Sequence, residues 1–278
     1  MNILPFDIAV ALASMIAGII GALVGLGGGI IITPVLVLGF GIDIRYAMGA
    51  ALVSVIATSS GAAAAFLRDG LSNMRIGMFL NVATTFGALA GAWLATVLPT
   101  AALSVVFGFA LLATVVLSLK QPGGEVESTG DALGKKLRLT GTLPAPGGAI
   151  PYGAQSVPGG FVMMVVAGIL SGLLGIGSGA FKVLAMDRIM KIPFKVSTTT
   201  SNFMIGVTAA ASVGIYLKRG YIDPTLAAPV ALGVLVGAFI GAKILPVAPT
   251  KSLRVLFLVA VTIIGIQMVA RGFGFNLG

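Results

Sequence analysis

A lysine and a run of hydroxyl side chains follow a glycine-rich break in an apolar stretch. Lys182 ends the segment GIGSGAFK (175–182), and the polar run STTTSN (197–202) comes next along the chain, while an earlier GLGGG (25–29) has the same character. A helix that begins after such a break presents free N–H groups and the positive end of its dipole, which together favour anions. A charge inside an apolar segment is by default a functional hypothesis. These residues predict an anion site at depth in a membrane.

The candidate substrate-binding residues come from both glycine motifs and from the hydroxyl groups that follow them. Six consecutive helical residues face every direction, so we expect only part of the run 197–202 to face a pore and the rest to bond back to carbonyl groups of the preceding turn. The alternatives are close helix packing for the glycines and hydroxyls and snorkelling to the interface for Lys182. The candidates are Gly25, Gly27, Gly28, Gly29, Ser54, Thr58, Gly175, Gly177, Ser178, Gly179, Lys182, Thr199, Thr200, Ser201 and Asn202.

The composition indicates which elements must position these residues. The 278-residue chain is 58% hydrophobic and 9% charged, with a mean hydropathy of +1.11. A helix of about 20 apolar residues crosses a bilayer core of ~30 Å. Runs near that length, bounded by Pro, Gly or charges, recur at 46–66, 76–98, 101–119, 161–175, 196–217, 226–246 and 252–270. The sequence therefore predicts an all-α, polytopic helical membrane protein, whose net charge of +9 belongs to loops between spans rather than to a nucleic-acid surface.

The two halves of the chain repeat each other at an offset of 150 residues. Shared glycines alone would be weak evidence, but loop chemistry and spacing match over a long register, which indicates a duplication. The matching segments are GLGGG (25–29) with GIGSG (175–179), FLRDG (66–70) with YLKRG (216–220), and GALAGA (87–92) with GAFIGA (237–242).

Each half is expected to hold a broken or re-entrant helix pair followed by three full spans. The pairs are 8–24 with 30–40 and 161–175 with 179–190. The predicted division is a first transmembrane repeat at 1–119, a polar linker or small lobe at 120–160 with a short hairpin around LRLTGTL, and a second repeat at 161–278.

Loop charge predicts the relative orientation of the halves. If each pair enters and returns to the same face, each half has an odd number of crossings and the repeats are inverted. Most Lys and Arg then share one face, and the positive-inside rule makes that face cytoplasmic. The linker is then cytoplasmic, both termini lie outside, and the outer face holds Arg45, Lys218, Arg219 and Arg271.

The paired glycine motifs carry a family resemblance. GLGGGIIITPVL (25–36) and GIGSGAFKVLAM (175–186) resemble the G-x-G-G-G-x-x-x-x-P-x-L motif of the TauE/SafE sulfite-exporter family of bacterial permeases, and the likeness covers nearly the whole chain. Ser178 replaces a motif glycine and Leu184 the proline. The family's A-x-G-T-S is matched by Thr200-Ser201 in the second half, whereas the first half has Ala50-Ala51. The resemblance implies export of sulfite or related sulfur-containing oxyanions and organosulfonates.

The absence of certain side chains narrows the mechanism. The chain has no His and no Cys, and its eight acidic residues lie in loops or near segment ends, so there is no obvious proton relay and no catalytic, metal or cofactor set. We therefore expect a transporter rather than an enzyme, driven by the membrane potential or the anion gradient, in the bacterial inner membrane. An anion channel or a non-transporting scaffold subunit is the alternative. The expected partners of the transporter are a small anionic substrate and the lipid bilayer, with no nucleic acid. We expect it to be a monomer or homodimer.

Overall fold

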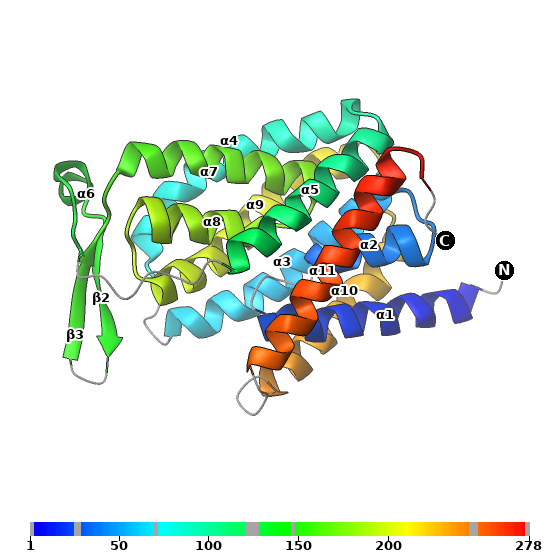
Figure 1. Ribbon diagram of the computed structural model, residues 1–278, viewed down its shortest axis with the longest axis horizontal. Helices are drawn as coiled ribbons and strands as arrows, with labels where there is room; N and C mark the ends of the chain where they lie inside the picture. Colours follow the sequence, from blue (N-terminus) through cyan, green and yellow to red (C-terminus); the bar gives the residue numbers. More distant parts are fainter. Residues whose placement is uncertain are drawn as a thin grey trace.

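The first half of the chain forms six helical elements (Figure 1). The computed structural model describes residues 3–24, 29–68, 72–119, 128–145, 148–244 and 250–275. The elements of the first half are α1 (Ile3–Val24), α2 (Gly29–Pro34), the π-helical turn η1 (Val35–Gly39), α3 (Ile44–Arg68), α4 (Met74–Val97) and α5 (Thr100–Leu119).

The second half has the same elements in the same order. They are α7 (Val157–Leu174), α8 (Gly179–Leu184), η2 (Ala185–Ile189), α9 (Phe194–Lys218), α10 (Pro224–Ile244) and α11 (Thr250–Gly272). The starts of α8, η2, α9, α10 and α11 each lie 150 residues after the starts of α2, η1, α3, α4 and α5. The repeat seen in the sequence is therefore a repeat of structure.

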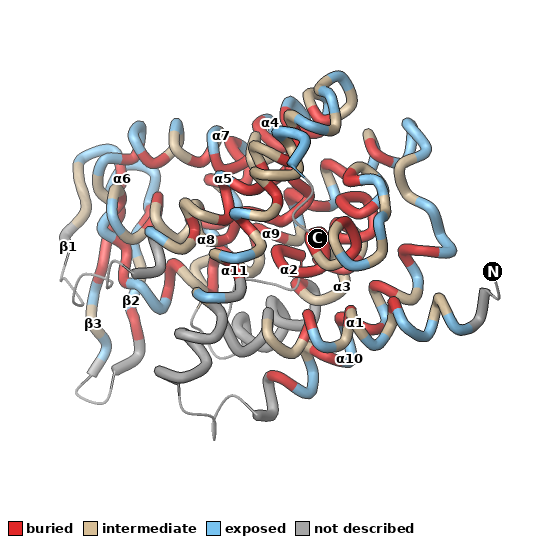
Figure 2. Tube along the Cα trace, turned by 45° about the vertical axis from the view of Figure 1, so that its right-hand side comes forward, coloured by how far each residue is buried: buried red, intermediate tan, exposed pale blue. Residues whose placement is uncertain are grey.

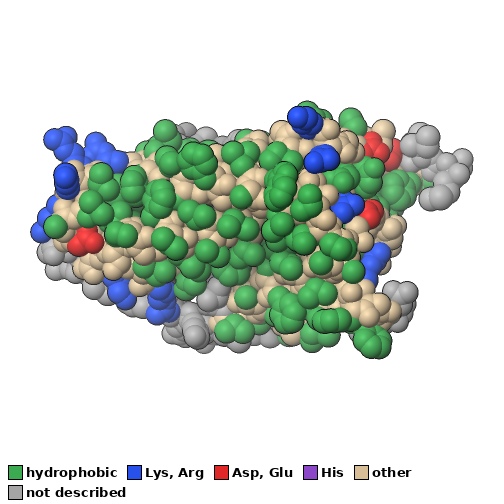
Figure 3. Space-filling model, turned by 90° about the horizontal axis from the view of Figure 1, so that it is seen from above, with side chains coloured by type: hydrophobic (Ala, Val, Ile, Leu, Met, Phe, Trp, Pro, Cys, Tyr) green, Lys and Arg blue, Asp and Glu red, His purple; other side chains and the backbone are tan. Residues whose placement is uncertain are grey.

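The helices form an elongated bundle whose sides are apolar. Within the described residues, four helices are long and apolar enough to cross a membrane, namely Met74–Val97, Val157–Leu174, Phe194–Lys218 and the Pro224–Gly241 part of α10. Large hydrophobic side chains such as Phe86, Trp93 and Phe239 are exposed on these helices. Figure 3 shows such apolar groups along the middle of one face and charged groups toward the two ends. The chain is a helical membrane protein, as its composition predicts.

The glycine breaks sit at the tips of two helical hairpins. The α1 hairpin returns to the end where it starts, since the rings of Phe6 and Phe40 pack edge-on at 5.8 Å. The α7 hairpin does the same at the other end, where the Gln155 N–H donates to the Met190 carbonyl at 2.9 Å. Each hairpin thus enters and leaves at one end of the bundle.

Only the second member of each hairpin is short. Helix α1 has 22 residues and α7 has 18, whereas the returning arms 29–39 and 179–189 are each a short helix followed by a π turn. Helix α7 begins at Val157 rather than at residue 161, because Pro158 lies in its first turn, where proline's fixed φ suits a helix and its missing N–H costs nothing.

Both returning arms change from α-helix to π-helix at the same place. In the first half the change follows Pro34, a residue that removes a helical hydrogen bond. In the second half it follows Leu184, which can donate normally. The π turn therefore belongs to the repeat rather than to the proline, and π turns are frequent at functional sites.

The halves are intertwined through close, glycine-mediated packing. A Cβ added at Gly87 or Gly91 would meet the backbone of α7, and one added at Gly237 would meet the backbone of α1. Helix α4 therefore lies on α7 and α10 lies on α1, each pair drawn from both halves. Glycine at such contacts lets two backbones approach closely, and these glycines belong to the repeated segments GALAGA (87–92) and GAFIGA (237–242).

The equivalent helices α3 and α9 pack against each other at the centre of the bundle and run in opposite directions. Near the start of α3, the Met48 sulfur lies 4.0 Å from the Tyr216 hydroxyl near the end of α9, and further along, Ser59 lies against Gly206. Figure 2 shows buried chain concentrated in this region. All six residues of α2 are buried beside it.

A small β-containing lobe joins the halves. Strands β2 (Thr140–Ala145) and β3 (Gly148–Gly153) form the expected hairpin, β1 (Ser128–Thr129) pairs parallel with β3, and α6 (Ala132–Lys136) completes the lobe. Apolar lobe residues such as Leu139, Leu143 and Tyr152 share a buried cluster with α4, α7 and α9. We call this end of the bundle the lobe end. Its described basic residues are Arg75, Lys135, Lys136, Arg138, Arg188, Lys191 and Lys195.

Asn73 fastens the lobe to the first half, and its replacement by alanine is expected to destabilise the protein by roughly 1–3 kcal/mol. Its side-chain oxygen caps α4 by accepting from the Ile76 N–H at 3.1 Å, while its amide donates to the Tyr152 hydroxyl at 3.0 Å and the Thr140 carbonyl at 3.2 Å. Thermal unfolding in detergent measures the effect. Asn73→Asp keeps the cap but lacks the amide donor, so an intermediate stability is expected. Equal stability of all three proteins would contradict this role.

Candidate functional site

The tips of the two hairpins meet near the middle of the bundle. A Cβ added at Gly29 would lie 3.5 Å from the Gly175 carbonyl oxygen and 3.7 Å from the Ile176 Cα. Val55 of α3 contacts both tips, since its side chain lies against Gly29 and within 3.5 Å of a Cβ added at Gly177. Gly25, Gly27 and Gly28 lie outside the described residues. The two glycine motifs therefore contribute to one region rather than to two separate sites.

The second break needs glycine for its conformation and for its close contacts. Gly175 and Gly177 have φ values of +67° and +73°, which L-residues with a Cβ rarely adopt. A Cβ at Gly175 would lie 2.8 Å from the Met48 carbonyl oxygen, and one at Gly177 or Gly179 would lie 2.6 or 2.8 Å from the Ile205 side chain. The break is thus a folded turn packed against α3 and α9.

Lys182 is fully buried beside this turn, with an exposed fraction of 0%. Its Nζ donates to the Thr208 hydroxyl at 2.6 Å and faces the Met204 carbonyl at 3.4 Å. Among the described residues no carboxylate lies within ion-pair distance, and the recorded ion pair joins Asp187 to Arg188. Burying an ammonium group with only neutral oxygens around it has a large desolvation free energy. An anion bound beside it would offset much of that free energy.

Two serine hydroxyls connect the turn to the neighbouring helices α7 and α9. The Ser178 hydroxyl donates to the Ala167 carbonyl of α7, and the Ser201 hydroxyl donates to the Gly179 carbonyl at 3.3 Å. Ser178, which replaces a motif glycine, adopts φ +42°. Its hydroxyl therefore ties the turn to α7, and its left-handed backbone has a conformational cost that glycine would not have.

The remaining candidates lie on α3 and α9 with their hydroxyls engaged. Thr199 donates to the Lys195 carbonyl at 2.9 Å, in line with the expected back-bonding, and the Thr200 hydroxyl accepts from the Asn73 N–H at 3.0 Å. Asn202 is partly exposed. Ser54 and Thr58 donate to the Ala51 and Ser54 carbonyls of their own helix at 2.8 and 3.0 Å. Among the described candidates on α3 and α9, Ser201 is the one whose hydroxyl reaches the end of the turn, at the Gly179 carbonyl.

Thr208 is the residue at this site that sequence reasoning did not select. It lies two turns after Thr200 on α9, about 12 Å along the axis, and is fully buried. Its hydroxyl donates to the Met204 carbonyl at 2.8 Å while it accepts from Lys182. The available signal was the repeat, which aligns Thr208 with the candidate Thr58.

The two halves are chemically unequal at this point. The residue equivalent to Lys182 is Ile32, also with an exposed fraction of 0%, and the equivalent of Thr208 is Thr58. The first half therefore offers an apolar side chain where the second offers a cation.

Comparisons with known proteins indicate the class of protein to which this site belongs. The family described as "Sulfite exporter TauE/SafE" matches residues 10–268. The chain belongs to the TauE/SafE family. It is 27% identical to the probable membrane transporter protein YunE of Bacillus subtilis, over 97% of this chain and 99% of that protein. It is also 27% identical to the probable membrane transporter protein YdhB of the same organism, over 88% of this chain and 93% of that protein. No solved structure matches significantly.

Membership of the TauE/SafE family agrees with a multi-pass membrane transporter and not with an enzyme. No group of three or more His, Cys, Asp or Glu able to hold a metal occurs in the part of the chain that the structure describes. The chemistry that this TauE/SafE protein offers at its centre is a single cation, hydroxyl groups and a glycine turn.

Replacement of Thr208 by valine is expected to lower anion flux through this TauE/SafE protein about tenfold or more. Valine has the shape of threonine but removes the oxygen that orients the Lys182 ammonium, and a hydrogen bond to a charged group contributes roughly 1.5–3 kcal/mol. Flux into proteoliposomes measures the effect. Thr114→Val is the matched control, because the Thr114 hydroxyl is also buried but bonds only within its own helix, to the Ala110 carbonyl at 2.9 Å. Equal losses in both variants would contradict the assignment.

Proposed function

We propose that this protein is a permease that exports sulfite, or a related sulfur-containing oxyanion or organosulfonate, through a site where the two hairpin tips meet. The observation that carries the proposal is the fully buried Lys182, whose ammonium contacts the Thr208 hydroxyl and the Met204 carbonyl but no described carboxylate. A small oxyanion would supply the missing negative charge. The candidate glycines and hydroxyls of both halves form the surroundings of this site in the proposal.

The proposed architecture is a pair of inverted-topology repeats, with three spans and one hairpin in each. Its support is that α3 and α9 run antiparallel, as do α5 and α11, where Gly108 lies against Gly265 and Gly272 lies against Val105. Two equivalent helices that pack antiparallel are related by an axis across their length. The basic lobe end makes that end cytoplasmic by the positive-inside rule, in the inner membrane of a bacterium.

The proposed mechanism is alternating access between the repeats, driven by the membrane potential. Moving one negative charge outward through 100 mV releases about 2.3 kcal/mol, so an anion exporter needs no proton relay. In this mechanism the α4–α7 pair and the α1–α10 pair, each drawn from both halves, move relative to each other around the central hairpin tips. The protein acts as a monomer or homodimer in this mechanism.

Sulfite flux in proteoliposomes tests the proposed function. With purified protein and a potassium diffusion potential, flux is expected to rise with the potential and to stay unchanged when a pH gradient is imposed. Flux that requires the pH gradient and ignores the potential would overturn the mechanism. Unitary currents in a planar bilayer would show a channel instead of a carrier, and a screen over sulfate, thiosulfate, sulfonates and simple carboxylates identifies the substrate class.

A further inference from the structure

A polar cavity lies at the end of the bundle opposite the lobe, away from Lys182. Its volume is about 170 Å³, and it is open on one side. The cavity is bounded by η1, by the starts of α3 and α5 and by the last turn of α11, and its lining residues are Val37, Asp43, Ile44, Thr100, Ala101, Ser104 and Arg271.

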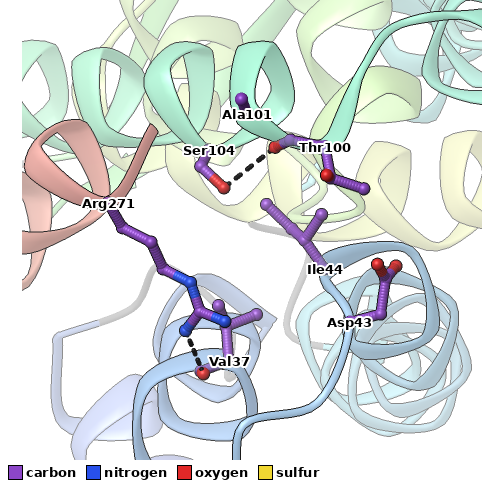
Figure 4. A pocket seen from close by; sticks show the side chains of 7 residues that line it. All are labelled: Val37, Asp43, Ile44, Thr100, Ala101, Ser104 and Arg271. Atoms are coloured by element: carbon purple, nitrogen blue, oxygen red, sulfur yellow. Dashed lines mark hydrogen bonds between the residues drawn. The ribbon is translucent and has the colours of Figure 1, made fainter. Parts of the chain in front are cut away.

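Arg271 places a positive charge in this cavity, and some of its N–H groups have no acceptor among the described residues. Its guanidinium donates through Nη1 to the Val37 carbonyl of η1. Among the described residues, Nε and Nη2 have no protein acceptor, and no carboxylate forms an ion pair with the group. Figure 4 shows Arg271 reaching from α11 toward Val37, with Ser104 and Thr100 across the cavity. A guanidinium fixed at one nitrogen and open at the others suits the oxygens of a small anion.

The opposite wall adds hydroxyl and amide groups. Ser104 is 5% exposed, but its hydroxyl donates its only proton to the Thr100 carbonyl at 3.0 Å, so the donors that this wall offers to an anion are backbone N–H groups. Thr100 and Ala101 are the first two residues of α5, and N–H groups in a first helical turn have no partner within the helix. Arg271 and these groups face one space from two sides.

Asp43 opposes an anion in the same cavity. One of its carboxylate oxygens accepts from the Arg45 N–H at 2.9 Å, so it caps the start of α3, and its negative charge remains at the edge of the lining. An anion bound to Arg271 is therefore held weakly. Weak binding suits a site from which a transported ion must leave.

We propose that this cavity is a second, low-affinity binding site for a small oxyanion of the size of sulfite or sulfate, which the ion occupies between the central site and the solution at the end away from the lobe. Arg271 binds the ion, the N–H groups at the start of α5 contact its other oxygens, and Asp43 keeps the affinity low. The claim that the ion passes through this cavity during transport rests on the proposed function, whereas the claim that the cavity binds an oxyanion does not.

The test uses the full-length protein with Lys182→Met, which removes the central cation, and sulfate as the probe in isothermal titration. Sulfate binding is expected to persist in this background. Arg271→Gln is expected to weaken it about tenfold or more, and Asp43→Asn to tighten it several-fold, because removing a nearby like charge favours the anion. Lys218→Gln is the matched control: it removes a positive charge from an exposed residue at the same end and is expected to change nothing.

Three outcomes would overturn the second site. They are loss of all sulfate binding on Lys182→Met alone, an unchanged affinity in Arg271→Gln, or weaker binding in Asp43→Asn, which would show that the Asp43 carboxylate does not oppose the bound anion. Arg271→Lys, which keeps the charge, is expected to retain part of the binding, and thermal unfolding without sulfate shows whether each variant is folded. None of these results changes the flux measurement on Lys182, so failure of this site and failure of the proposed permease are distinguishable.

Discussion

Replacing Lys182 with methionine is expected to reduce sulfite flux on the order of 100-fold while leaving the protein at least as stable as the wild type. The loss follows because an anion at depth would lose Lys182, the one fully buried cation among the described residues, and leaving one member of such a pair alone costs roughly 3–5 kcal/mol. Stability is retained because methionine has a similar length and removes a desolvated charge. Flux in proteoliposomes and the unfolding temperature of the same preparation measure the two effects.

The combination of these two readouts separates a binding role from a structural one. If the Lys182 ammonium only fastened α8 to α9 through Thr208, its loss would lower the unfolding temperature and affect flux no more than other destabilising changes. Lys218→Met, at an exposed position of α9, controls for removal of any positive charge. A Lys182→Met protein with wild-type flux would refute the central site.

An alanine at Gly175 is expected to destabilise the protein by about 2–4 kcal/mol, a drop of several degrees in unfolding temperature. The left-handed backbone at φ +67° alone costs an L-residue roughly 1–2 kcal/mol, and the new Cβ would lie 2.8 Å from the Met48 carbonyl oxygen. That oxygen belongs to the backbone of α3, so it cannot turn aside as a side chain could.

Gly214→Ala is the matched control for Gly175→Ala. Gly214 lies within α9, has no positive φ, and a Cβ added there has no neighbour within 4 Å. Alanine is the better helix former, so the unfolding temperature is expected to stay the same or rise slightly. If Gly175→Ala were equally well tolerated, the tight turn between α7 and α8 would not be as described.

The repeat was the most informative feature of the sequence. Matching GLGGG to GIGSG predicted new segments from residues 30 and 179, and the structure begins equivalent helices at Gly29 and Gly179. This agreement follows because glycine spacing and turn residues are local signals. Back-bonding was expected for part of the run 197–202, and Thr199 shows it, because a helical hydroxyl can reach the carbonyls of the preceding turn.

Contacts between distant segments could not be predicted in this way. The pairing of Lys182 with Thr208 depends on how α8 folds back along α9, and no spacing rule relates a returning arm to a neighbouring span. The early start of α7 was missed because Pro158 and the glycines after it are as typical of a linker as of a first helical turn. The π turns have no sequence signal, since one follows Pro34 and the other Leu184.

The packing of α1 on α10 has a consequence for how the chain is made. A ribosome releases α1 first, but the glycines that receive it, Gly233 and Gly237, are synthesised more than two hundred residues later. Helix α1 must therefore wait in the bilayer, bordered by lipid on the side that α10 will cover. Native folding of the first half can finish only after most of the second half has been inserted, so biogenesis ends with the two halves closing around each other.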